Sequence, residues 1–163
     1  MKNQTKTREE LLKNIHRIVV KVGTSTLTTE DGNLNIDKIK KIALELSNLS
    51  NKGYDVALVT SGAVGAGMGV LGIEERPKTL TEKQAVSAVG QVSLMHLYQT
   101  FFHEHGKVIA QLLLTKGEFS DRRRYLNARN VCNTLLNRKI IPIINENDAI
   151  VQHEQKAADN DTM

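Results

Sequence analysis

Four short apolar runs divide the chain, and each is continuous instead of alternating with polar residues. They cover residues 18–22, 56–59, 108–114 and 140–144. A continuous apolar run is typical of a strand that is covered on both faces, as strands of parallel sheets are. The fourth run contains Pro142, which cannot donate a ladder hydrogen bond. We therefore expect the fourth strand to be irregular or to lie near an edge of the sheet.

Helical patterns lie between these runs. The first apolar stripe consists of Ile36, Ile39, Ile42, Leu46 and Leu49, and a longer helix carries Ala85, Val89, Val92 and Leu97. Thr81, followed three residues later by Gln84, predicts the start of the longer helix. Strands that alternate with helices need crossover connections, and these make a parallel sheet. The pattern predicts an α/β fold of three layers, α-β-α, with a mainly parallel sheet.

The segments that follow the four runs are all polar. They read KVGTS, TSGAVGAG, TKGEFSD and NENDA in chain order. Parallel strands end at one rim of the sheet, and open α/β sheets bind their ligands at that rim. These four segments are rich in glycine and in residues with hydroxyl, amide, carboxylate or amine side chains. They therefore predict a site for a polar, charged ligand at the rim.

The first two segments offer groups that suit anions. Lys21 supplies a positive charge, Gly23 allows close approach of the backbone, and Thr24 and Ser25 add donors for phosphoryl oxygens. An ordinary strand-ending turn with a solvated lysine explains the first segment equally well. A glycine step into a helix at Gly62 offers free N–H groups to a carboxylate or phosphate, although close helix packing through small residues accounts for it as well.

Two nucleotide-binding patterns are excluded. Residues 67–72 match the spacing of a dinucleotide fingerprint, but the match begins about two turns past the strand end, and no acidic residue follows a second strand at the expected place. Nicotinamide and flavin cofactors are therefore not expected. No segment has the two glycines followed by lysine and a hydroxyl residue that form a P-loop.

The last segment is the most acidic and amide-rich part of the chain. Carboxylates and amides of this kind could coordinate a hard cation or bind an α-amino group, and a solvated loop is the simpler alternative. The residues concerned are Asn145, Asn147, Asp148, Asp159, Asn160 and Asp161. His103 and His105 fit the carboxyl end of the long helix better than a metal site. His153 and Glu154 receive no role.

Composition narrows the class of protein. The 163 residues are 40% hydrophobic and fit one domain, while six aromatic residues without tryptophan give little to stack on nucleic-acid bases. The net charge of +4 is modest and owes much to the arginines at 122–124. Cys132, the single cysteine, excludes an internal disulfide and reads as a small buried residue. No signal sequence or membrane segment appears, so we expect a cytoplasmic protein.

Five motifs, in order, resemble those of the glutamate 5-kinases within the amino acid kinase family. They are VVKVGTSTLT, VTSGAVGAG, AVGQVSLMHLYQTFF, DRRRYLNARN and IPIINENDAI, and the similarity runs from Arg17 to the last residue. The resemblance implies ATP-dependent phosphorylation of the glutamate side-chain carboxylate, the first step of proline synthesis. It also implies ATP and Mg²⁺ as cofactors, L-glutamate as substrate and a homo-oligomer, without a membrane or nucleic-acid partner.

The same resemblance implies roles for individual residues. Lys21 would contact the transferring phosphoryl group, and Gly23, Thr24 and Ser25 would line the ATP phosphates. Glutamate would be held by Ser61, Gly62, Asp148 and Asn160, with help from Asp159. Asp161 would orient a catalytic lysine. No protein ligand of a metal is assigned.

Two departures from the family qualify these implications. Ala158 stands where glycine usually precedes the acidic motif, and family members continue past the equivalent of Met163 into an adenine site with a second lysine. We therefore expect residues 1–16 to be an extension, and residues 17–163 to be the amino-terminal, amino-acid-binding part of a kinase domain. That part would be truncated after about four strands and inactive alone. Alternatives are a kinase for carbamate, aspartate or acetylglutamate, or a non-catalytic binder of amino acids or nucleic acid.

Overall fold

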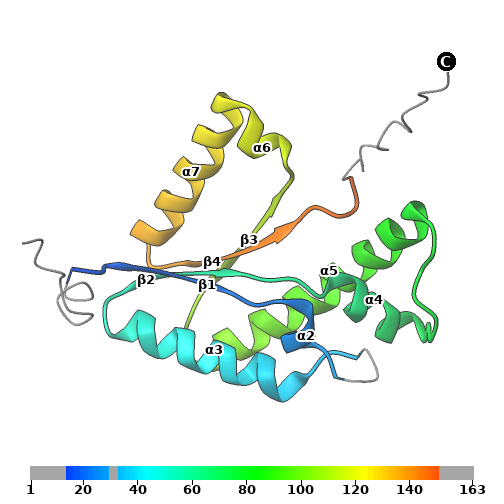
Figure 1. Ribbon diagram of the computed structural model, residues 1–163. Helices are drawn as coiled ribbons and strands as arrows, with labels where there is room; N and C mark the ends of the chain where they lie inside the picture. Colours follow the sequence, from blue (N-terminus) through cyan, green and yellow to red (C-terminus); the bar gives the residue numbers. More distant parts are fainter. Residues whose placement is uncertain (1–13, 30–32, 151–163) are drawn as a thin grey trace, which may run out of the picture.

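The computed structural model describes residues 14–29 and 33–150. Figure 1 shows strands and helices alternating along the described chain. In order, the elements are β1 (Arg17–Lys21), α2 (Thr24–Leu27), α3 (Ile36–Asn51), β2 (Asp55–Val59), α4 (Ala63–Leu71), α5 (Leu80–Glu104), β3 (Ile109–Leu114), α6 (Gly117–Ser120), α7 (Arg122–Asn137) and β4 (Ile141–Glu146).

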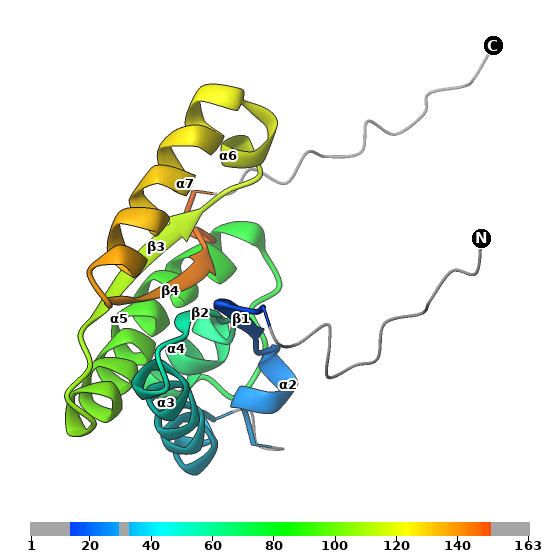
Figure 2. The same cartoon turned by 90° about the vertical axis from the view of Figure 1, so that its left-hand side faces the viewer.

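The four strands form one parallel sheet in the order β1-β2-β4-β3. Helices α3 and α5 lie on one face and α7 lies on the other (Figures 1 and 2). The chain crosses the sheet in one direction from β1 to β3 and then returns to β4. Right-handed crossovers require the returning helix, α7, to lie on the opposite face. The predicted three-layer α-β-α fold is therefore confirmed.

The position of β4 corrects one expectation. This strand, which contains Pro142, lies between β2 and β3 and not at an edge of the sheet. Ile141 donates its N–H to Val108 on the β3 side, so the proline nitrogen faces β2. Pairing between β2 and β4 begins only at Leu58 and Ile143. The missing donor thus falls just before the point where pairing between β2 and β4 begins.

Helix α5 begins two residues before the predicted start. Thr79, not Thr81, is the N-cap: its side chain accepts the N–H of Glu82, and the Glu82 carboxylate accepts the N–H of Thr79 in return. These hydrogen bonds, led by the one from the backbone of Thr79, lower the pKa of Glu82. A capping box does start the helix, but it is formed by Thr79 and Glu82 and not by the predicted pair, Thr81 and Gln84.

The buried face of α5 also differs from the predicted stripe. Val92 is 73% exposed and Ala85 is exposed, and the residues turned inward include both apolar and polar side chains. The buried set is Val86, Ser87, Gly90, Gln91, Leu94, Tyr98, Phe101 and Phe102. The stripe predicted for α3 is confirmed in its centre, where Ile39 and Leu46 are buried, but Ile36 at its first turn is 45% exposed.

The main core lies between the sheet and the layer of α3 and α5. Its largest fully buried side chains include Tyr98, Phe102, Leu58 and Ile143. On the other face α7 buries only Leu136 and leaves Val131 47% exposed. The layer with α3 and α5 therefore holds most of the buried apolar area, which is the dominant favourable term in folding.

Helices α4 and α5 meet through two glycines. A Cβ on Gly90 would lie 1.8 Å from the carbonyl oxygen of Ala63, and one on Gly67 would lie 1.9 Å from that of Val86. Only glycine permits backbones this close. The dinucleotide-like spacing at residues 67–72 therefore serves helix packing in part, and this packing fixes where the first turn of α4 sits against the sheet.

Within residues 14–29 and 33–150, no helix has both the length and the apolar character that crossing a membrane would require.

Candidate functional site

A cavity of about 720 Å³ opens at the carboxyl rim of the sheet. The sequence predicted that all four rim segments contribute to one site. The segments that follow β1, β2 and β4 line this cavity, and the segment that follows β3 does not. We refer to it as the rim cavity. Its lining residues are Thr24, Ser25, Thr28, Thr29, Ser61, Gly62, Ala63, Val64, Gly65, Met68, Glu74, Arg76, Asn145, Glu146 and Asp148.

The segment after β1 joins the segment after β2 by hydrogen bonds. Thr24 donates its hydroxyl to the Ser61 hydroxyl oxygen at 3.2 Å, and Ser61 donates to the carbonyl oxygen of Val22 at 3.1 Å. Two residues predicted from separate motifs are thus in contact. Gly23 has an ordinary φ of −81°, and a Cβ there would meet nothing within 4 Å. The fold as described does not itself require glycine at position 23.

Helix α4 directs its amino terminus at the rim cavity. Its N-cap, Gly62, has a φ of +92°, a left-handed conformation that favours glycine, and no side chain caps the helix. The first turn therefore offers uncapped N–H groups on Ala63, Val64 and Gly65, all of which line the cavity. Free N–H groups and the positive end of the helix dipole attract carboxylate or phosphate.

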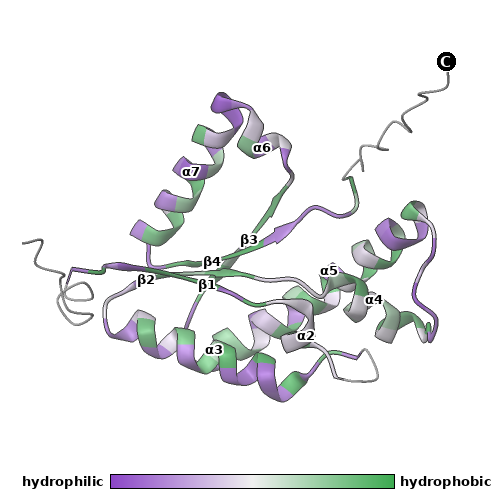
Figure 3. Cartoon of the chain, viewed as in Figure 1, coloured by the Kyte–Doolittle hydropathy of each residue, from purple (hydrophilic) through white to green (hydrophobic). Residues whose placement is uncertain are grey.

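The end of β4 brings acidic and amide groups to the same cavity. Figure 3 shows the polar character of this strand end, where Asn145 and Glu146 follow the apolar half of β4. Asp148 lies just beyond and lines the cavity with them. A cavity with helix N–H groups and carboxylates offers partners both for carboxylate or phosphate and for an ammonium group.

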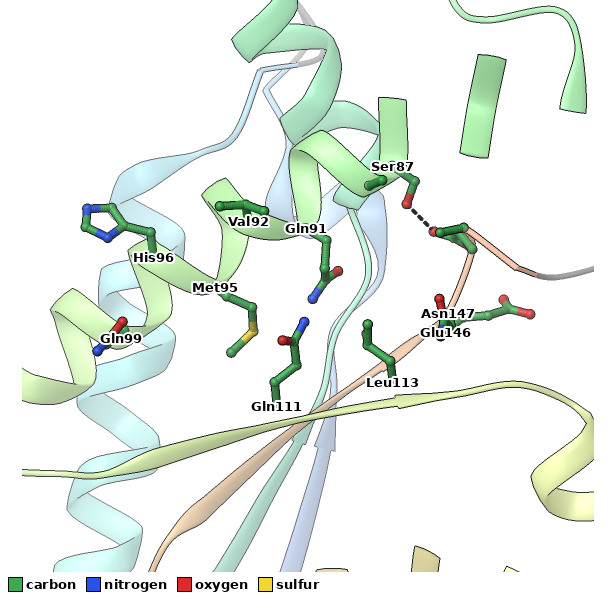
Figure 4. A pocket seen from close by; sticks show the side chains of 13 residues that line it. Ser87, Gln91, Val92, Met95, His96, Gln99, Gln111, Leu113, Glu146 and Asn147 are labelled. Carbon is green, nitrogen blue, oxygen red and sulfur yellow. Dashed lines mark hydrogen bonds between the residues drawn. The ribbon is translucent and has the colours of Figure 1, made fainter. Parts of the chain in front are cut away.

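A second cavity, of about 560 Å³, lies between α5 and β3 (Figure 4). We refer to it as the side cavity. It shares Glu146 and Asp148 with the rim cavity, and Gln91 and Gln111 extend into it from the two sides. Its walls are otherwise largely apolar, through Met95 and Leu113 among others, whereas the rim cavity carries hydroxyls and helix N–H groups. The rim cavity therefore suits a charged ligand better.

Sequence reasoning missed the polar side chains on the buried face of α5. Ser87 donates to Asp148 at 2.8 Å, and Asn145 donates to Gln91 at 2.8 Å. Further along, Tyr98 and Thr60 share a hydrogen bond of 2.8 Å, and burial raises the pKa of Tyr98 to about 12. The spacing of Ser87, Gln91 and Tyr98 could have indicated that they are buried, because they share one face of α5 with buried Val86, Gly90 and Leu94.

Other lining residues also escaped prediction. Glu74 and Arg76 come from the connection between α4 and α5 and line the rim cavity. Arg76 makes no ion pair with any residue in the described part of the chain. Nothing in the local sequence distinguishes this arginine from other exposed cations.

Lys21 and Gly23 lie at the carboxyl rim but are not among the residues that line the rim cavity. Lys21 ends β1 and is exposed beside Val59 in the register of the sheet. Asp159, Asn160 and Asp161 lie outside the described residues, as do His153, Glu154 and Ala158. The roles implied for Lys21, Gly23, Asp159, Asn160 and Asp161 therefore stay predictions.

The third rim segment, after β3, does not reach the rim cavity. Glu118 instead accepts hydrogen bonds from the N–H and the hydroxyl of Thr115, at 2.5 and 2.7 Å. These bonds, the one from the hydroxyl being the larger cause, lower the pKa of Glu118. The segment forms the short helix α6. It does not reach the rim cavity because β3 is the outer strand and lies two positions away from β2.

The remaining candidates occupy ordinary structural positions. The arginines at 122–124 form the exposed first turn of α7, where Asp121 is the N-cap. His103 lies in the last turn of α5, and His105 is its C-cap. Cys132 is half-buried in α7, where burial raises the pKa of its thiol. A raised pKa disfavours the reactive thiolate, in keeping with a packing role.

Comparison with known proteins gives a consistent result. Residues 16–163 match the sequence profile of the amino acid kinase family. A glutamate 5-kinase of Caldanaerobacter subterraneus subsp. tengcongensis is 56% identical over 147 residues, which are 90% of this chain and 40% of that protein. A glutamate 5-kinase of Clostridium tetani is 54% identical over 156 residues, 96% of this chain and 58% of that protein.

A third relative, a glutamate 5-kinase of Moorella thermoacetica, is 51% identical over 152 residues. The chain spans 40 to 58% of the length of these three proteins. The profile match covers nearly all of the present sequence, and the parallel sheet with a polar rim agrees with it. The chain belongs to the amino acid kinase family.

Proposed function

We propose that the protein phosphorylates the side-chain carboxylate of L-glutamate with ATP and forms L-glutamyl 5-phosphate, the first step of proline biosynthesis. The observation that carries the proposal is the rim cavity, where uncapped N–H groups of α4 and the carboxylates of Glu146 and Asp148 line one space. The proposal is supported by the sequence identity of 54 to 56% to two glutamate 5-kinases, in alignments that cover 90 and 96% of this chain. We further propose that the protein works in the cytoplasm as a homo-oligomer.

The proposed binding mode follows from charge. An amino acid with two carboxylates needs donors for both acids and an acceptor for its ammonium group. In this scheme Ser61 and the first turn of α4 bind carboxylate, and Asp148 binds the ammonium group. Asn160 and Asp159 are proposed to complete the amino-acid site.

The proposed chemistry needs no general base, because an ionised carboxylate is already a nucleophile. The protein must align this carboxylate with the γ-phosphorus of ATP and neutralise the oxygens on which charge develops. Lys21 is proposed to contact the transferring phosphoryl group, with Gly23, Thr24 and Ser25 beside the ATP phosphates. Asp161 is proposed to orient a catalytic lysine.

A divalent ion is part of this proposal. The described residues bring together no group of three histidine, cysteine or acidic side chains that could hold a metal. We propose that Mg²⁺ would be held by the phosphate oxygens of ATP, because Mg²⁺ in kinase sites is usually bound through substrate phosphates together with one or two carboxylates. When bound, Mg²⁺ would neutralise part of the negative charge of the ATP phosphates.

The test is steady-state turnover of the protein in its natural full length. ADP release is measured with glutamate, aspartate, acetylglutamate and carbamate, each with hydroxylamine present to trap an acyl phosphate. Glutamate should give the highest kcat/KM by at least about tenfold, since one missing methylene costs roughly 1–3 kcal/mol of binding. A higher kcat/KM with another acid would assign the site to that acid.

Substitution of Asp148 tests the binding mode. Asp148→Ala should raise KM for glutamate and leave KM for ATP nearly unchanged, because an ion pair to the ammonium group forms before and during reaction. Glu45→Ala is a suitable control, since Glu45 is an exposed acid of α3 and does not line the rim cavity. An unchanged glutamate KM in Asp148→Ala would exclude Asp148 from the substrate site.

A further inference from the structure

Helix α5 holds the segment around the end of β4 through two side chains one turn apart. Ser87 and Gln91 are 3% and 9% exposed. Their partners, Asp148 and Asn145, are three residues apart in the segment that lines the rim cavity. Residues four apart on a helix lie on one face, so the helix contacts this segment at two points.

The first contact joins a buried hydroxyl to a carboxylate. Ser87 Oγ donates to Asp148 Oδ2 at 2.8 Å, drawn as the dashed line in Figure 4. Within the described part of the chain, this is the one hydrogen bond that the Asp148 carboxylate makes. It engages one oxygen and leaves the other, Oδ1, for a ligand. A hydrogen bond to an ionised group is stronger than a neutral one.

The second contact fixes the backbone next to it. Asn145, 6% exposed, donates to Gln91 Oε1 at 2.8 Å and accepts the N–H of Glu146 at 2.9 Å. The N–H of Asn147 donates to Leu114 of the neighbouring strand at 2.9 Å. With the backbone held there, the carboxylate rotamer of Asp148 is the remaining freedom, and Ser87 is the group that restrains it.

We propose that Ser87 is a positioning residue that orients the Asp148 carboxylate toward the ammonium group of the substrate. The inference rests on the proposed function and adds a source of specificity to it. A fixed carboxylate favours amino acids over the same acids without an amino group, because only the ammonium group reaches the oriented oxygen. Ser87 acts through Asp148 and does not touch the substrate.

The experiment compares Ser87→Ala with Ser93→Ala in the natural full-length protein. Ser93 is on the same helix, and its hydroxyl makes no hydrogen bond in the described part of the chain, so the same atoms are removed without a change at Asp148. The substrates are glutamate and glutarate, which is the same five-carbon diacid without the amine. Turnover is followed as ADP release, and glutamate binding is measured separately by calorimetry.

Ser87→Ala should raise KM for glutamate by about tenfold, the scale of one hydrogen bond to a charged group, and leave KM for ATP unchanged. The preference for glutamate over glutarate should fall by the same factor. Ser87→Thr keeps a hydroxyl and should retain most of the preference, and Ser93→Ala should behave as the natural protein. In an Asp148→Asn background, Ser87→Ala should add little, because the two residues act as one unit.

Equal losses with glutamate and glutarate would overturn the inference, since they would indicate a general effect on folding. A loss in Ser93→Ala as large as in Ser87→Ala would overturn it as well. These results would leave the proposed function standing, because the natural protein would still phosphorylate glutamate. Absence of phosphorylation by the natural protein would refute the proposed function, and the inference with it.

Discussion

Replacing Gly90 by alanine should disrupt the contact between α4 and α5. The added Cβ would lie 1.8 Å from the carbonyl oxygen of Ala63 and 2.3 Å from the amide nitrogen of Gly67. Ordinary contact begins at 3.4 Å, so the helices must separate by roughly 1.6 Å along this direction. Both neighbours are backbone atoms of α4, and no side chain can turn aside to make room.

The size of the effect follows from two opposing contributions. Overpacking costs about 3 kcal/mol when only backbone can move, at the upper end of the usual range. Alanine in a helix interior is favoured over glycine by about 1 kcal/mol. The net loss in free energy of unfolding should be about 2 kcal/mol, which corresponds to a fall of roughly 4–8 °C in Tm for a chain of this size.

Urea unfolding followed by circular dichroism measures this loss, with Gly69→Ala as the matched control. A Cβ on Gly69, in α4, would lie 2.9 Å from Oδ1 of Asn33, the end of a flexible side chain. The control should therefore be as stable as the natural protein or slightly more stable. If Gly90→Ala unfolds at the same urea concentration as Gly69→Ala, the close approach of the two helices is not required for folding.

Three further substitutions test other parts of the structure. Tyr98→Phe leaves Thr60 without its 2.8 Å partner and should cost about 1–2 kcal/mol of unfolding free energy at pH 7. The pKa of Tyr98 is raised to about 12, so above pH 10 the unfolded state ionises first and the natural protein should lose stability. The phenylalanine variant should lose less stability over the same pH range. Equal alkaline dependence of stability in urea unfolding would contradict this. The hydrogen bond from Lys139 lowers the pKa of Asp55. Asp55→Asn should therefore lose up to about 1 kcal/mol of unfolding free energy at pH 6, and its stability should decline less steeply below pH 4 than that of the natural protein. An unchanged dependence of stability on acid pH would show that the ion pair contributes nothing. Lys21→Ala should lower kcat strongly and leave glutamate binding by calorimetry intact, whereas weaker binding with unchanged kcat would refute a role at the phosphoryl group.

The sequence predicted the layers of the fold because continuous apolar runs and helical spacing report burial directly. The four strands and the two predicted helices, α3 and α5, lie where these patterns placed them, to within a few residues. The expectation that Pro142 marks an irregular or edge strand was wrong in placing β4 near an edge, because the effect of a proline depends on which neighbouring strand its nitrogen faces. Sheet order decides that, and local sequence does not encode sheet order.

The site was predicted in part for a similar reason. Thr24 and Ser61 were identified separately from their motifs, and the fold brings them into contact. The helical spacing of Ser87 and Gln91 places them on the buried face of α5, but it does not identify their hydrogen-bond partners. Their partners are 61 and 54 residues away, so only tertiary structure reveals them.

The central claim is that the natural full-length protein transfers a phosphoryl group from ATP to the glutamate side-chain carboxylate. The direct measurement uses glutamate labelled with oxygen-18 in that carboxylate, with hydroxylamine to trap the product. Attack by the carboxylate places a labelled oxygen between carbon and phosphorus, and hydroxylamine then releases phosphate that carries the label. We predict labelled phosphate and glutamyl hydroxamate in equal amounts with ADP. Release of ADP with unlabelled phosphate and no hydroxamate would contradict the claim.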